Sequence, residues 1–352
     1  MKVLIAGGAG FIGSTIASAC LDNGMTPVIL DNLATGRAEF ARDRIFYQGD
    51  IADGPLIDKI FTEHPEITAV VHAAAVIVVP ESVEQPLRYY RENVAKSVEF
   101  IDHVVRNGCG RYLFSSSAAI YRPGEDFSVD ETSPLEPLSP YARTKMVMEH
   151  LLEDCAAAYD LRVVSLRYFN PIGADPQLRS GLQIARPSHL LGKLLTSVET
   201  GEEFLLTGVD WPTRDGSGIR DFIHVWDLAE AHVAALRRFD EVLPPWIRSG
   251  GPAIGPQAES LAPPGGETSY QVINLGTGHG TTVKEFVAAF EAVTHRALRT
   301  REVAARPGDN AGSFTRSVKA YELLGWQPRF TLEQGIDDSA RWAALRADRL
   351  PA

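Results

Sequence analysis

The sequence predicts an α/β protein in which a doubly wound parallel sheet carries a smaller α/β lobe formed by later residues. Two observations predict this fold class. Short apolar runs alternate with longer amphipathic stretches through the first 170 residues, and a glycine-rich turn joins the first run to the first amphipathic stretch. Continuous apolar strands separated by helices are typical of a parallel sheet covered on both faces, because right-handed crossovers place helices on each side.

The individual elements follow in chain order. The first amphipathic stretch, FIGSTIASACLDNG, ends on a helix-stopping Asn-Gly pair. Prolines and glycines break the rhythm after Asn170, and a later strand-like run, 270–276, precedes the helical pattern TTVKEFVAAFEAV. Two further helices are expected around 317–325 and 331–347. The expected strands before Asn170 are 2–6, 27–30, 44–48, 68–73, 111–115 and 161–169.

The change of rhythm also predicts two lobes and an insertion. The first lobe, which holds the sheet, is expected to comprise 1–170, about 222–243 and 270–276; the second, about 171–221 and 277–352. Segment 244–268 is rich in Pro, Gly, Ala and Ser and is too long for a structureless loop inside a compact domain. We expect either a mobile surface insertion or a functional lid there.

Composition places the chain among globular proteins, since 45% of its 352 residues are apolar and 22% are charged. A net charge of −11, from 34 basic and 45 acidic residues, argues against a nucleic-acid or anionic-membrane partner. No run approaches the ~20 apolar residues of a membrane span, and the first residues lack a signal-peptide pattern. The three cysteines form no CxxC pair. We therefore expect no metal site and a cytoplasmic location.

Gly7, Gly10 and Gly13 form a GxxGxxG turn between the first strand and the first helix. Glycine lets the backbone approach a pyrophosphate, and the helix N-terminus offers free N–H groups to the phosphates. This strand–turn–helix context predicts a dinucleotide site of the Rossmann type. Asp31 ends the second strand, 18 residues after Gly13. A carboxylate there binds ribose hydroxyls and repels a 2′-phosphate, which favours NAD over NADP.

Residues at the ends of the third and fourth strands fit the same ligand. Asp50 is expected to bind the adenine by a hydrogen bond, and Ile51 by packing. The small residues Ala73-Ala74-Ala75 would let a dinucleotide lie across the strand ends, whereas the preceding His72 is expected to be a packed core histidine.

The stretch from Tyr141 to Lys145 is the only YxxxK among ten tyrosines. On a helix the two side chains share a face, and the ammonium would lower the tyrosine pKa from about 10 toward neutrality. Such a tyrosine can take or give a hydroxyl proton while a hydride leaves the same carbon. Ser115-Ser116-Ser117 end the fifth strand, where a serine can hold the reacting oxygen.

With these motifs the sequence resembles an extended short-chain dehydrogenase/reductase, and within that superfamily the UDP-glucose (UDP-galactose) 4-epimerase family. The resemblance runs from residue 3 to about 328. One matching stretch is DWPTRDGSGIRDFIHVWDLAEAHV, within which WPTRDGSGIRDFIHV is far more specific than the Rossmann glycines. The other matching stretches are GGAGFIGS, LDNLATG, GDI, PESVEQPLRYYRENV, FSSSAAIY, SPYARTK, LRYFNPIGA, INLGTGHG, RPGD and LGWQP.

The resemblance implies a tightly held NAD and inversion at C4 of a UDP-hexose through a 4-keto sugar. Tyr141 would exchange the C4 hydroxyl proton while the hydride passes to NAD and back. Catalytic residues would be Ser117, Tyr141 and Lys145. The implied NAD contacts are Gly7, Gly10, Phe11, Ile12, Gly13, Asp31, Asn32, Asp50, Ile51, Ala73, Ala74, Ala75, Asn93, Tyr141, Lys145 and Phe169. The UDP-sugar substrate would contact Ser117, Asn170, Arg220, Arg306, Asp309 and Ser313. The family also implies a homodimer packed through two long helices, near 81–107 and 139–159.

Four positions depart from the family pattern. Ile77 replaces a lysine near the cofactor phosphates and nicotinamide ribose, and Glu92 replaces an asparagine, so that a carboxylate stands where an amide meets the cofactor. Thr207 stands where an aromatic side chain packs on the base. Ser313 falls where a side chain controls the room around the sugar 2-substituent, and a small serine would leave space for an N-acetyl group.

Three other functions stay open at this point. The nearest is a 4-epimerase of another nucleotide sugar: UDP-N-acetylglucosamine, a UDP-pentose or a UDP-uronate. A nucleotide-sugar 4,6-dehydratase needs an acidic pair after the strand-five serine, where this chain has Ala118-Ala119. A non-catalytic NAD-binding protein is disfavoured because Ser117, Tyr141 and Lys145 are all present.

Overall fold

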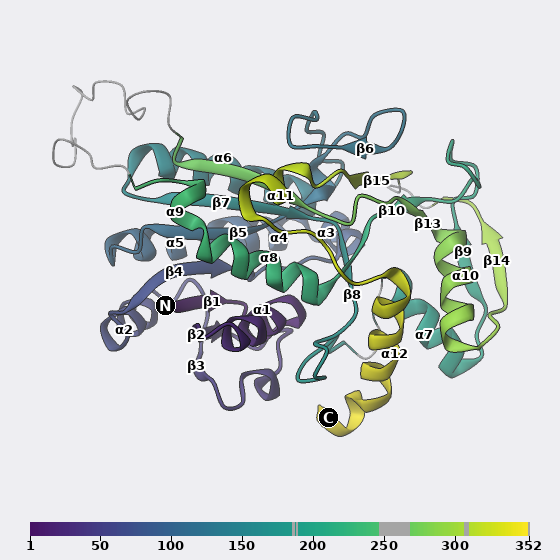
Figure 1. Cartoon of the computed structure of the whole chain (residues 1–352), viewed down its shortest axis with the longest axis horizontal. Coiled ribbons are helices and arrows are strands. Elements are labelled where there is room, and N and C mark those ends of the chain that lie inside the picture. The colour runs from purple at the N-terminus through teal and green to yellow at the C-terminus, as the bar shows by residue number, and fades with distance from the viewer. Residues whose placement is uncertain (185–186, 188, 246–267, 306–309, 351–352) are drawn as a thin grey trace.

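The computed structural model describes residues 1–184, 187, 189–245, 268–305 and 310–350. Seven parallel strands form its central sheet: β1 (Lys2–Ala6), β2 (Thr26–Asp31), β3 (Ile45–Gln48), β4 (Ile67–His72), β5 (Arg111–Ser117), β7 (Arg162–Tyr168) and β12 (Tyr270–Leu275). The strand order is β12-β7-β5-β4-β1-β2-β3 (Figure 1). It reverses at β1, so the predicted doubly wound fold class is confirmed.

The strands lie where the apolar runs predict them because both faces of the sheet are buried. Val3 and Ile5 pack into one core, and Leu4 and Ala6 pack into the other, so β1 has no solvent face. The first core is covered by α1 (Phe11–Asp22), α8 (Val225–Arg237) and α11 (Val318–Leu324). The second core is covered by α2 (Gly54–Glu63), α5 (Lys96–Arg106) and α6 (Pro140–Ala158).

The chain between β4 and β5 differs from the single long helix expected near 81–107. It consists of α3 (Val79–Glu84), α4 (Pro86–Tyr90), a π-helical turn η2 (Arg91–Ala95) and α5. Pro86 lacks the N–H donor that a continuous helix needs, which accounts for the break between α3 and α4. The expectation of one long helix is wrong here. The helix expected near 139–159 is present as α6.

A smaller α/β part lies beside the sheet (Figure 1). Its helices α7 (Leu190–Thr200), α10 (Val283–Thr294) and α12 (Leu332–Arg349) pack around a separate core that includes Phe286 and Phe290. Its four-stranded sheet has the order β13 (Thr281–Thr282), β10 (Ile219–Arg220), β15 (Gly312–Thr315), β6 (Ser128–Val129). The remaining elements are the pairs β8 (Asn170–Ile172) with β11 (Phe222–His224) and β9 (Phe204–Thr207) with β14 (Thr300–Val303), and the short helices η1 (Ala38–Ala41), η3 (Ala118–Ile120) and α9 (Phe239–Val242).

The later part of the chain follows the sequence-based expectations. The run 270–276 forms β12 at the edge of the sheet, and α10, α11 and α12 form where helices are expected. The expected insertion, 244–268, lies outside the described residues apart from its ends. Within the described ranges, no helix is both long enough and apolar enough to cross a membrane. The same ranges contain no group of three or more His, Cys, Asp or Glu side chains that could hold a metal ion.

Candidate active site

The glycine turn connects β1 to α1 and rests on the end of β4. Gly7 has φ +80°, and a Cβ there would lie 2.6 Å from the backbone nitrogen of Ala74. A Cβ on Gly13 would lie 2.1 Å from the Gly7 carbonyl oxygen, so only glycine allows the helix to start this close to the strand. Gly10 is the N-cap of α1 and supplies no side-chain cap, so the first N–H groups of the helix need another partner.

Asp31 ends β2 beside this turn and is only 8% exposed. Its Oδ2 accepts a hydrogen bond from Ala9 N at 2.9 Å, and its Oδ1 accepts one from Leu33 N at 2.8 Å. Burial raises the pKa of Asp31, and the two backbone donors oppose that effect. The carboxylate is therefore held rigidly, and each oxygen keeps a lone pair for a ligand hydroxyl.

The residues expected around the adenine lie together at the end of β3. Asn32 Nδ2 donates to Asp50 Oδ2 at 3.0 Å, and Ile51 is buried. Glu92, one of the departures, does not stand alone, because Lys96 Nζ donates both to Glu92 Oε2 and to Asp50 Oδ2 at 2.7 Å. A charge-paired cluster therefore occupies this edge of the sheet.

Asn93 lies in the π-helical turn and is 3% exposed. Its Oδ1 accepts from Val76 N and its Nδ2 donates to Val76 O, both at 2.9 Å, while Nδ2 also donates to Thr144 Oγ1 at 3.1 Å. The side chain is thus paired with protein at both ends and ties the segment after β4 to α6. Next to Val76, the Ile77 side chain points to solvent with 59% exposure.

His72 fits the expectation of a packed core histidine. It is 1% exposed, and its Nδ1 lies 2.6 Å from the Tyr112 hydroxyl. Burial lowers the pKa of His72 to about 3, so the ring is neutral. His72 is the last residue of β4, so its relation to the site is that it directly precedes the segment that begins at Ala73.

Ser117, Tyr141 and Lys145 come together where β5 ends and α6 begins. Ser139 Oγ accepts from Ala142 N at 3.1 Å and caps α6, so that Tyr141 lies in the first turn and Lys145 in the second. Ser117 is 8% exposed and hydrogen-bonds with Tyr141.

The electrostatics of this trio differ from the sequence-based expectation. Burial raises the pKa of Tyr141, and the Ser117 hydrogen bond only partly opposes it. Lys145 Nζ donates to the Ser115 carbonyl at 2.7 Å and lies 4.8 Å from the centroid of the Phe114 ring. The predicted lowering of the tyrosine pKa is therefore wrong for this arrangement. Burial also lowers the pKa of Lys145 to about 8, against a smaller raising effect of Glu149.

A buried network behind the trio was not foreseen. Arg167 Nε donates to Glu149 Oε1 at 2.9 Å, and the two side chains are 6% and 5% exposed. Ser116 Oγ donates to Glu149 Oε1 at 2.5 Å, and Arg167 Nη1 donates to the Tyr121 hydroxyl at 2.7 Å. That hydroxyl donates in turn to Asn274 Oδ1 at 2.7 Å, so α6, β5, β7 and β12 are joined. The available signal was the position of Glu149, one helical turn after Lys145 on the same face.

The residues expected to bind substrate fall on neighbouring strands. Arg220 in β10 lies opposite Ser313 in β15. Arg220 Nη1 donates to the carbonyls of Ile219 at 2.7 Å and Ala311 at 2.8 Å. Gly312 has φ +106°, and a Cβ there would lie 1.9 Å from Arg220 Nη1, so glycine is required for this contact.

The structure gives fewer contacts for the remaining residues that are expected to bind substrate or NAD. Asn170 begins β8, and its Nδ2 donates to the Asp221 carbonyl at 3.2 Å. Phe169, expected near NAD, is buried in a small cluster with Ala118 and Tyr121. Thr207 ends β9. Two expected residues, Arg306 and Asp309, lie outside the described residues.

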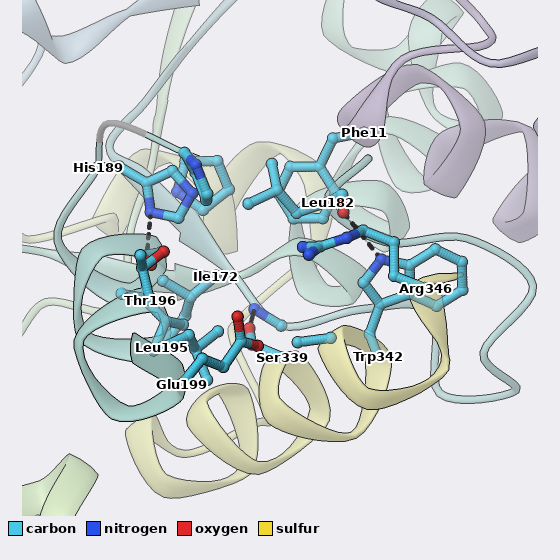
Figure 2. Close-up of a pocket in the computed structure, with 16 residues that line it drawn as sticks. Phe11, Ile172, Leu182, His189, Leu195, Thr196, Glu199, Ser339, Trp342 and Arg346 are labelled. Atoms are coloured by element: carbon cyan, nitrogen blue, oxygen red, sulfur yellow. Dashed lines mark hydrogen bonds between the residues drawn. The ribbon is translucent and has the colours of Figure 1, made fainter. Parts of the chain in front are cut away.

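A small pocket opens between α7 and α12 (Figure 2). Phe11, from the first turn of α1, lines it together with Leu195 and Trp342. Glu199 and Arg346 bring opposite charges to it. The pocket shares Phe11 with the expected NAD contacts, but Ser117, Tyr141 and Lys145 do not line it.

Comparison with known proteins agrees with this geometry. The sequence profile described as "NAD dependent epimerase/dehydratase family" matches residues 3–247. A UDP-glucose 4-epimerase of Halalkalibacterium halodurans is 37% identical over 344 residues, covering 97% of this chain and 95% of that protein. The crystal structure of UDP-glucose-4-epimerase from Stenotrophomonas maltophila, with bound NAD and formylated UDP-arabinopyranose, superimposes with a TM-score of 0.87 at 34% identity, covering 99% of both chains.

A second solved structure agrees with the first. It is UDP-glucose 4-epimerase from Brucella ovis in complex with NAD, with a TM-score of 0.85, 34% identity and 97% of both chains covered. Sequence and structure thus match over nearly the whole chain. The chain belongs to the NAD dependent epimerase/dehydratase family.

Proposed function

We propose that this protein catalyses the NAD-dependent epimerisation of a UDP-hexose at C4, interconverting UDP-glucose and UDP-galactose. The observation that carries the proposal is the grouping of Ser117, Tyr141 and Lys145 at the end of β5 in a Rossmann sheet. The neighbouring strand in that sheet is β4, and the glycine turn rests against its end. Relatives named UDP-glucose 4-epimerase at 34 to 37% identity over nearly the full chain support the same activity.

The residues present fit NAD. The glycine turn leaves the first N–H groups of α1 without a side-chain cap, which suits a pyrophosphate, and the buried Asp31 carboxylate suits a ribose without a 2′-phosphate. When bound, NAD supplies reversible acceptance of a hydride from the sugar carbon. The further contacts proposed for it are Phe11, Ile12, Asn32, Asp50, Ile51, Ala73, Ala74, Ala75, Asn93 and Phe169.

Proton transfer is proposed for Tyr141, which takes the proton of the C4 hydroxyl and later returns it. Ser117, hydrogen-bonded with the phenol, would hold the same sugar oxygen. The pKa of Tyr141 has to fall for this step, and Lys145 would lower it by turning from the Ser115 carbonyl toward the phenol. Since the pKa of Lys145 is about 8, its ammonium is charged at neutral pH.

The UDP moiety is proposed to contact Asn170 and Arg220 together with Arg306 and Asp309. A guanidinium presents planar donors that suit diphosphate oxygens. Arg220 is positioned on β10 by the carbonyls of Ile219 and Ala311, which fixes the direction of its side chain.

The direct test uses the purified full chain and UDP-galactose, with no cofactor added and with products separated by chromatography. Appearance of UDP-glucose is the expected result, and it would establish both 4-epimerisation and retained NAD. Absence of conversion, both with and without added NAD, would refute the proposal.

The small side chain of Ser313, opposite Arg220, favours tolerance of an N-acetyl group at C2. We expect the wild type to epimerise UDP-N-acetylgalactosamine as well as UDP-galactose. Ser313→Tyr is expected to lower kcat/KM for the N-acetylated sugar by about tenfold or more, and that for UDP-galactose by no more than about threefold. Steady-state kinetics with both substrates measure this, and a wild type active only on UDP-galactose would contradict it.

A homodimer is also proposed. Large apolar side chains are exposed along α3, α4 and α5, and Leu87 is the most exposed of them at 78%. We call this set the α3–α5 patch; its members are Val79, Val83, Leu87, Tyr90 and Val98. Exposed apolar patches mark association surfaces, and the patch lies where the family resemblance expects the dimer contact.

Leu87→Asp is expected to convert the dimer to a monomer, because it would bury an unpaired carboxylate in the contact. Size-exclusion chromatography with light scattering measures the mass of the wild type and the variant. Val318→Asp, at a 57% exposed position on α11, is the matched control and should leave the dimer intact. A monomeric wild type would contradict the proposal.

The three cysteines are free, with Cys20 and Cys109 buried and Cys155 half-buried. Free thiols are the usual state in a reducing compartment, and they support the proposed cytoplasmic location.

A further inference from the structure

Three charged side chains form a cluster at the end of β3: Asp50, Glu92 and Lys96. The glycine turn alone gives no reason for this cluster. Lys96 Nζ lies 2.7 Å from Asp50 Oδ2 and 2.7 Å from Glu92 Oε2. The three side chains are 24%, 31% and 29% exposed, respectively, so they are partly shielded from solvent. An ammonium between two carboxylates holds both in place and leaves the cluster with one net negative charge.

The hydrogen bonds to Asp50 show how many lone-pair sites of its carboxylate remain for a ligand. A carboxylate has about four lone-pair sites. Asp50 Oδ1 accepts from Ala52 N at 3.0 Å, and Oδ2 accepts from both Asn32 Nδ2 at 3.0 Å and Lys96 Nζ at 2.7 Å. Among the described residues, these donors occupy three sites and leave one on Oδ1. That site can accept one further N–H group.

The position of Asp50 fits a base next to the Asp31 ribose site. The chain after β3 is tied to β2, because Gly49 N donates to the Asp31 carbonyl at 3.0 Å. The two carboxylates therefore follow neighbouring strands at the same edge of the sheet, and Ile51 supplies apolar surface beside them. Burial alone would raise the pKa of Asp50, but the hydrogen bonds from Lys96, Ala52 N and Asn32 outweigh it and lower the pKa, so this carboxylate is ionised at neutral pH.

We propose that Lys96, held by Glu92, is a positioning residue that orients Asp50 to accept a hydrogen bond from the 6-amino group of the adenine of NAD. The proposal rests on the proposed function only in taking NAD as the ligand. The proposal also assigns a role to Glu92, for which the sequence alone predicts only a negative charge near the cofactor. Here that charge restrains Lys96, and Lys96 restrains Asp50.

A competition experiment separates base recognition from simple attraction of phosphates. The full-length protein is incubated with equal concentrations of NAD and nicotinamide hypoxanthine dinucleotide until the bound ratio is constant. The bound dinucleotides are then isolated by gel filtration and separated by chromatography. Hypoxanthine carries a 6-keto acceptor in place of the 6-amino donor, whereas the two phosphates are unchanged. A carboxylate that accepts from adenine should therefore make the wild type retain mainly NAD.

Lys96→Met is expected to lower the bound ratio of NAD to the hypoxanthine analogue by about tenfold, the size of one hydrogen bond to a charged group. Lys96→Arg should keep the ratio within about threefold of wild type. Lys59→Met, which removes a lysine that pairs with Glu63 on the surface of α2, is the matched control and should not change the ratio. In an Asp50→Asn background, Lys96→Met should change the ratio no further.

An unchanged ratio in Lys96→Met would overturn the proposal, even if total binding falls, because loss of phosphate attraction weakens both dinucleotides equally. A further fall in the Asp50→Asn background would also overturn it. A wild type that retains NAD and epimerises UDP-galactose, with no effect of Lys96, refutes this inference alone. A wild type that retains neither dinucleotide refutes the proposed function together with it.

Discussion

Tyr141→Phe is expected to lower kcat for UDP-galactose by about a thousandfold, within the range that a positioned acid or base contributes. The change removes only the hydroxyl that is proposed to exchange a proton with the sugar. The ring stays in the first turn of α6, whose cap is formed by Ser139 and not by the tyrosine. Initial rates by chromatography measure kcat, and cofactor released from the denatured protein measures NAD content, which should match wild type.

The control for this substitution is Tyr321→Phe, at a 62% exposed position on α11. It makes the same chemical change far from the site and should alter kcat by less than about twofold, as surface changes usually do. A Tyr141→Phe enzyme with more than a tenth of wild-type kcat would contradict the proposed proton exchange. A rise in KM alone would point to substrate positioning instead.

The sheet could be predicted from sequence because its signal is local. In β1 each residue faces one of two buried cores, so a continuous apolar run is sufficient to mark the strand. The helical segment before β5 is a different case. Asn93 pairs with Val76 and Thr144, which are distant in sequence, and those tertiary contacts accompany a π-helical turn that no local pattern distinguishes from an α-helix.

The candidate site likewise has some features that the sequence predicts and others that depend on tertiary contacts. The glycine turn and the YxxxK spacing are local, and the structure places them next to the strands from which they were expected. The protonation behaviour of the site depends on burial and on partners from other elements. Lys145 is buried to 4% exposure beneath residues of other elements, and this burial lowers its pKa to about 8 instead of leaving it near that of a surface lysine. The spacing of Tyr141 and Lys145 along one helix does not show which groups from other elements surround them.

The ion pair of Glu149 and Arg167 gives the largest expected effect on stability. Glu149→Gln keeps the size of the side chain but leaves the Arg167 guanidinium, 6% exposed, without its carboxylate. Breaking one partner of a buried pair typically costs about 3 to 5 kcal/mol, because the remaining charge is uncompensated. We expect the free energy of unfolding to fall by that amount, as measured by denaturant titration followed by circular dichroism.

Removing both charges tests whether the loss comes from the unpaired guanidinium. In the double variant Glu149→Met, Arg167→Met, neither charge of the pair remains buried, so it should be more stable than Glu149→Gln alone although Ser116 and Tyr121 lose a partner. Asp102→Asn breaks the exposed pair with Arg106 and should cost about 1 kcal/mol or less. If Glu149→Gln were no more destabilising than Asp102→Asn, the buried network behind Ser117, Tyr141 and Lys145 would not contribute measurably to stability.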